Sequence, residues 1–153
     1  MTTALLILHG LMAVALIGAI THQTLAAWAP SGPRPHSFFG RFRAVKGAAF
    51  ANAVVALYAA VAILGAIVYL DFKVDIEPAL ERDRHWHALG CFDLKEDFAA
   101  IGLSLLPAYW FSWRRPAQDP SRTHAILTAI LAFVVWWSFL VGHVLNDIMG
   151  FGS

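Results

Sequence analysis

The sequence is short of charged residues. Only 14% of its 153 residues are Asp, Glu, Lys or Arg, whereas soluble domains carry about 25%. Hydrophobic residues make up 59% of the chain, against about 45 to 50% in a typical soluble domain. This composition excludes an ordinary soluble domain and indicates an integral membrane protein.

Cysteine and the common catalytic motifs are also scarce. Cys91 is the single cysteine, which excludes an intramolecular disulfide and a thiolate cluster built from this chain alone. The sequence has no glycine-rich phosphate loop and no HExxH or CxxC motif, and its short basic loops argue against nucleic-acid binding. We therefore expect a subunit or an electron carrier rather than a stand-alone enzyme.

Long apolar runs are what the sequence has in abundance. Three of its four apolar stretches reach the length of about 20 residues that crosses a hydrocarbon core of about 30 Å. The third stretch, Phe98 to Trp113, has 16 residues, which span only about 24 Å as a helix. We expect this helix to borrow a turn from the preceding residues, which brings Glu96 to the membrane edge. The predicted spans are about 4–28, 47–70, 93–113 and 125–149.

The distribution of charge predicts the topology. No Lys or Arg precedes Arg34, so the first apolar stretch lacks the positive start of a signal peptide and is interpreted as a retained span. The first loop has four basic residues and no acidic one, whereas the segment 71–97 has eight acidic residues and four basic ones. By the positive-inside rule, both termini and the middle loop lie outside, which is the periplasm for a bacterial inner membrane.

The predicted fold is all-α: an integral membrane antiparallel four-helix bundle with both termini outside, formed by a single domain covering 1–153. The outer loop, 71–92, contains a possible short surface helix that starts near Glu77 and Pro78. The second span is rich in alanine, which permits close helix packing in lipid. Its Asn52 is the one strongly polar residue in that span, and we expect it to form an interhelical hydrogen bond.

The histidines within the spans are the first candidates for a site, because an ionisable residue inside a membrane is costly. His9 lies about a turn and a half from the outer start of the first span, and His143 lies about as far from the outer end of the fourth. An up-and-down bundle places them at the same level. His22 and His124 form a second candidate pair on the cytoplasmic side. The helical phases, about 140° between His9 and His22, argue against two stacked haems and favour one outer site.

Two kinds of occupant suit that outer site. If His9 and His143 converge between apolar walls, the expected cofactor is haem b with both histidines as axial ligands. The alternative is a single Fe, Cu or Zn ion or a proton-handling site, built with carboxylates and loop histidines. His143, Asn146 and Asp147 stand at i, i+3 and i+4, which places them on one side of the helix. The candidates for this alternative, beside the two histidines, are Glu96, Asp147, His85 and His87.

The hydropathy and histidine placement, with LHG in the first span and GHVLND in the last, are generally similar to those of small bacterial four-helix membrane proteins that associate with haem or copper. This likeness implies a small redox component, such as an electron-transfer or accessory subunit of a respiratory complex. Its expected partners are the lipid bilayer, other membrane subunits or further copies of the chain, and a quinone. A cofactor-free subunit that packs on larger membrane partners is the competing hypothesis, with the histidines as ordinary interfacial residues.

Overall fold

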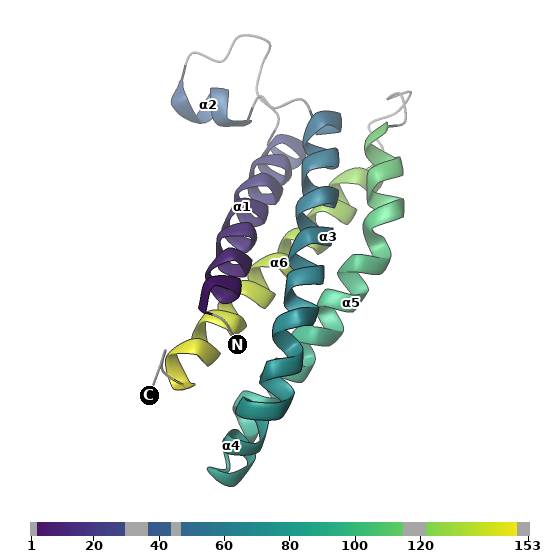
Figure 1. The fold of residues 1–153 in the computed structure, drawn as a ribbon. Helices are drawn as coiled ribbons and strands as arrows, with labels where there is room; N and C mark the ends of the chain where they lie inside the picture. The colour runs from purple at the N-terminus through teal and green to yellow at the C-terminus, as the bar shows by residue number, and fades with distance from the viewer. Residues whose placement is uncertain (1–2, 30–36, 44–46, 115–121, 150–153) are drawn as a thin grey trace.

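The computed structural model describes residues 3–29, 37–43, 47–114 and 122–149, and the elements in these ranges are all helical (Figure 1). Four helices are long: α1 (Thr3–Trp28), α3 (Gly47–Asp71), α5 (Trp86–Arg114) and α6 (Arg122–Met149). Three short elements complete the described chain: α2 (Phe38–Arg43), the π-helical turn η1 (Phe72–Ile76) and α4 (Glu77–Arg82). The prediction of an all-α chain is therefore confirmed for the described residues.

Three of the helical segments are long and apolar enough to cross a membrane: Thr3–Trp28, Ala49–Arg82 and Arg122–Asp147. The fourth long helix, α5, differs from them because its first half is charged. It has 29 residues, contains Pro107 without ending there, and begins at Trp86 rather than near 93. The short third apolar stretch is thus extended, as expected, but by more than one turn.

Each long helix packs against two others. α1 contacts α3 and α6, and α5 also contacts α3 and α6. The two chain ends lie on the side of the molecule toward α4, and α2 lies at the opposite end (Figure 1). The four long helices therefore surround a common interior, with alternating chain direction.

The segment 71–92, expected to be a loop with one short helix, is helical over most of its length. α3 continues through η1 into α4, and α5 returns alongside, so the two form a helical hairpin beyond the chain termini (Figure 1). Its turn has Arg84 in the left-handed conformation, with φ of 60°. The His85 amide donates to the Leu80 carbonyl at 2.9 Å and the Arg84 amide to Glu81 at 3.1 Å, which is a Schellman ending of α4. Stacked rings of Phe72 and Phe92, 3.7 Å apart, close the hairpin.

Polar side chains join the helices at the α2 end of the molecule. Tyr109 of α5 donates to Gln23 of α1, and both side chains are fully buried. Asn52 accepts hydrogen bonds from Trp110 Nε1 at 2.8 Å and from Arg114 at 3.1 Å. The predicted interhelical bond of Asn52 is therefore confirmed, and it fixes α3 against the end of α5.

Candidate functional site

A cavity of about 470 Å³ lies among the long helices, in the half of the molecule toward the chain termini. Its walls come from α1, α3, η1, α5 and α6. The size falls within the range of about 300 to 1,000 Å³ that is common for ligand pockets. Small side chains on each of the four long helices leave this space open: Gly10, Ala13, Ala62, Gly65, Ala66, Ala99, Ala100 and Gly142.

His9 forms part of the α1 wall. Its ring lies against Gly65 of α3, so closely that a Cβ atom on Gly65 would be 3.2 Å from the His9 Cε1 atom. The Nδ1 atom is buried and has no hydrogen-bond partner among the described residues. Lys95, Glu96 and the backbone carbonyl of Val61, one turn before Gly65, are close enough to interact electrostatically with the ring. His9 therefore offers a buried nitrogen with unused bonding capacity beside the cavity.

His143 lines the same cavity from α6. Its side chain is 66% exposed, and its Nε2 atom is 3.8 Å from an oxygen of Asp147. The ring of Phe139, one turn earlier, is nearly parallel to the His143 ring, with centroids 6.3 Å apart. The pair with Asp147 is long for an ion pair and exposed, so it holds the imidazole only loosely.

Three polar residues follow the apolar part of α6: His143, Asn146 and Asp147. The structure places them in different surroundings. Asn146 lines the cavity with His143, whereas Asp147 is 71% exposed and does not contribute to the lining. The lining residues Ser138, Gly142 and Asn146 mark the stripe of α6 that faces the cavity. His143 lies about 100° from Gly142 around the helix and Asp147 about 140°. His143 therefore stands at the edge of the stripe and Asp147 beyond it.

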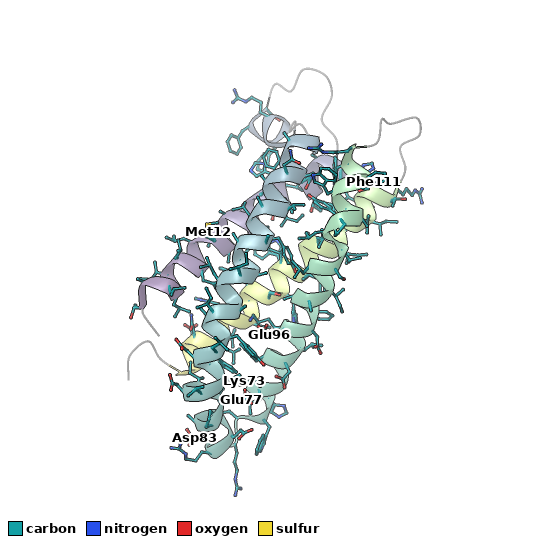
Figure 2. All side chains as sticks on the ribbon, turned by 45° about the vertical axis from the view of Figure 1, so that its right-hand side comes forward. Met12, Lys73, Glu77, Asp83, Glu96 and Phe111 are labelled. Atoms are coloured by element: carbon teal, nitrogen blue, oxygen red, sulfur yellow. The ribbon has the colours of Figure 1, made fainter. Side chains whose placement is uncertain are left out.

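Glu96 lines the cavity from α5. In Figure 2 it lies toward Lys73, Glu77 and Asp83 and away from Phe111, which marks the other end of α5. Its neighbour Lys95, which the sequence reasoning did not single out, lines the cavity as well and contacts Glu96 Oε1 through its Nζ atom at 2.5 Å. The only sequence signal for Lys95 was its place in the charged turn before the third apolar stretch.

Ser138 is a second cavity residue that the sequence did not reveal. Its hydroxyl is buried and has no hydrogen-bond partner among the described residues, like the Nδ1 atom of His9. A serine between apolar residues of a span carries no recognisable signal, because such hydroxyls ordinarily bond to the carbonyl one turn earlier. Two unsatisfied polar atoms thus border one cavity.

The other predicted histidines lie elsewhere. His22 packs beside Phe50, with ring centroids 5.9 Å apart, and His124 lies edge-on to Trp113 at 4.8 Å. These contacts belong to the end of the molecule near α2, and neither histidine lines the cavity. His85 and His87 are exposed at the start of α5 and do not line it either.

The residues of the alternative metal site are not gathered into one cluster. Within the described ranges, no group of three or more His, Cys, Asp or Glu side chains is close enough to hold a metal ion. The cavity instead brings together two histidines, one lysine and one glutamate, with Ser138 and Asn146 as further polar groups. Such a wall suits a mainly apolar ligand with few polar groups.

No protein-family model, no curated protein and no solved structure matches this chain.

Proposed function

We propose that this chain crosses a bacterial inner membrane four times, with both termini on the periplasmic side. In this proposal α5 crosses the membrane in addition to the three long apolar segments. The support for α5 is its packing between α3 and α6, which are both apolar enough to cross. The support for the orientation is the basic first loop and the acidic segment 71–97, read by the positive-inside rule.

The single cysteine gives a direct test of that orientation. Cys91 is exposed on the hairpin, so a membrane-impermeant maleimide should label it in intact spheroplasts. A protein with Cys91→Ser and Arg41→Cys moves the thiol to the exposed face of α2 and should react only after the membrane is opened. Labelling in the reverse order would contradict the orientation.

For the cavity, we propose the binding of one haem b, which His9 and His143 would hold through their ring nitrogens. The observation that carries this proposal is the presence of both histidines on the wall of one cavity, where the Nδ1 atom of His9 has no partner. Haem b needs no more than two ligands from the protein, and two histidines can provide them. A metal ion bound by side chains alone would need a larger cluster, and none is present among the described residues. His9 is held against Gly65, and His143 approaches from α6.

Bound haem b supplies one-electron redox chemistry. The protein would then act as an electron carrier or as a redox subunit of a respiratory complex, exchanging electrons with a quinone or with another subunit. The residues of this chain would contribute the two nitrogen ligands and a largely apolar wall around the haem. Phe139 beside His143 and Leu103 of α5 are parts of that wall.

Reduced-minus-oxidised absorbance spectra test this function. We expect the purified protein, or the protein reconstituted with haemin, to show the bands of a low-spin b-type haem at about one haem per chain. His9→Ala and His143→Ala should each abolish them, whereas His85→Ala, at an exposed position outside the cavity, should leave them intact. Absence of haem absorbance in folded wild-type protein would refute the proposal.

A second candidate function is favoured by one observation, the exposed pair formed by His143 and Asp147. In a cofactor-free accessory subunit, these residues are interfacial and the exposed apolar helix faces pack on larger partners. That hypothesis predicts that His143→Ala leaves assembly with partner subunits unchanged. It also predicts that a bulky residue in place of Ala56, which is exposed on α3, prevents assembly.

A further inference from the structure

Lys95 is an unusual residue for the wall of a mainly apolar cavity. It lies on α5, and only 19% of its side chain is exposed. Its ammonium group lies 4.5 Å from the centre of the Phe92 ring, another residue of the cavity wall. A lysine so enclosed loses part of its hydration and needs a partner of opposite charge.

The partner that this chain provides is a poor one. Glu96 is the next residue along the helix, and neighbouring helical side chains point about 100° apart. The glutamate is more exposed than the lysine, at 40% of its side chain. Water therefore competes for the carboxylate, so the ammonium group can exchange this partner for a second anion in the cavity.

The other polar groups of the cavity complete the arrangement. His9 is close enough to Lys95 to interact with its charge, and the unsatisfied hydroxyl of Ser138 lines the same space. Other parts of the lining, such as Leu16 and Val135, are buried and apolar. The cavity thus offers a cation paired with the carboxylate of Glu96, beside hydrogen-bonding groups and an apolar surface, which suits an amphiphile whose acidic group competes with Glu96 for Lys95.

We infer that the ligand of this cavity carries a carboxylate that pairs with Lys95. The inference rests on the proposed function in its first form, because haem b bears two carboxylates on one edge of an apolar ring. A fatty acid presents the same chemistry and is the other source of such a group. Lys95 is in this view a specificity residue for the acidic group, distinct from the ligands of the iron.

The test compares an acid with its ester in the wild-type protein. Haemin and haemin dimethyl ester are titrated into the protein in a mild detergent, and binding is followed by absorbance. A charge-assisted bond at a partly exposed lysine is expected to make haemin bind roughly tenfold more tightly than its ester, equivalent to about 1.4 kcal/mol. Lys95→Gln should remove this preference and Lys95→Arg should retain it. Arg82→Gln, at an exposed basic residue of α4 outside the cavity, should change nothing.

The outcomes separate this inference from the haem proposal. Equal binding of haemin and its ester by the wild-type protein would overturn the role of Lys95 and leave the haem proposal standing. If neither compound binds, the haem proposal fails, and a fluorescent fatty acid and its methyl ester take their place. A preference for the acid that is lost in Lys95→Gln then supports the inference, and no preference overturns it. Equal binding in the wild-type protein overturns the inference without any variant, and a preference for the acid that persists in Lys95→Gln overturns it as well.

Discussion

Gly102 and Tyr58 provide the sharpest test of the packing that encloses the cavity. Tyr58 of α3 reaches across to α5, where its hydroxyl donates to the carbonyl of Ala99 at 2.9 Å. It passes directly over Gly102: a Cβ atom there would overlap the tyrosine hydroxyl and lie 2.9 Å from Tyr58 Cζ and 3.1 Å from Val134. Gly102→Ala must therefore displace Tyr58, a residue of the cavity wall.

The expected cost follows from three contributions. Overpacking of a tight interior costs about 1 to 3 kcal/mol, and loss of the bond from Tyr58 to Ala99 costs about 0.5 to 1.5 kcal/mol. Replacing glycine by alanine within a helix returns about 0.5 to 1 kcal/mol. We therefore expect Gly102→Ala to lower the free energy of unfolding by roughly 0.5 to 4 kcal/mol, with a central value of about 2 kcal/mol.

The assay is unfolding in mixed micelles, in which a denaturing detergent replaces a mild one. Gly18→Ala is the matched control, because a Cβ atom on Gly18 would meet nothing within 4 Å, and it should be neutral or slightly stabilising. Adding Tyr58→Phe to Gly102→Ala removes the overlapping hydroxyl. The double variant should lose at least about 0.5 kcal/mol less than the sum of the single losses. Equal stability of Gly102→Ala and Gly18→Ala would refute the described packing.

Three further predictions use the same protein. Gln23→Leu should destabilise it by about 1 kcal/mol, since it leaves the buried Tyr109 hydroxyl without this acceptor. Adding Tyr109→Phe should recover part of that loss in the unfolding assay, and no recovery would contradict the coupling. Gly65→Val should weaken haem binding at least about tenfold in the absorbance titration, because its side chain occupies the space of the His9 ring. Unchanged affinity would speak against His9 as a ligand. Asp147→Asn should change thermal stability by less than about 0.5 kcal/mol, because the carboxylate is 71% exposed. A loss above about 1 kcal/mol would show that its contact with His143 is stronger than the geometry indicates.

The sequence predicts the long helices well because apolar runs and helix length are tied by membrane thickness. α1 and α3 end at or within one residue of their predicted bounds, at Trp28 and Asp71. The start of α5 was missed because the charged stretch 93–97 separates residues 86–92 from the third apolar stretch, yet residues 86–92 pack as a helix beside η1 and α4. Phe92 stacking on Phe72 and Leu80 buried in the hairpin provide that packing. Such tertiary stabilisation is invisible to a hydropathy count.

The sequence predicted the level of the candidate residues along the bundle, but not which of their side chains face the cavity. Counting residues from the ends of the spans placed His9, Glu96 and His143 at one level, and all three line one cavity. The separation of Asn146 from Asp147 was not predictable, since i+3 and i+4 flank His143 on opposite sides and either could face inward. The cavity itself depends on where small residues of four helices meet. That is a property of packing and not of any one sequence stretch.

Buried polar side chains at the two ends of the bundle differ in whether they have hydrogen-bond partners. This difference favours the cavity as the place where a ligand would bind. Near α2, buried or half-buried side chains bond to each other: Gln23 with Tyr109, and Trp113 with Thr128. In the half toward the termini, His9 Nδ1 and Ser138 Oγ are buried at the cavity without partners. An unsatisfied buried polar group costs about 1 to 3 kcal/mol. Among the described residues, two such groups at one cavity support the proposal that a ligand binds there, whereas the buried Trp137 Nε1, which lacks a partner as well, lies outside the cavity lining.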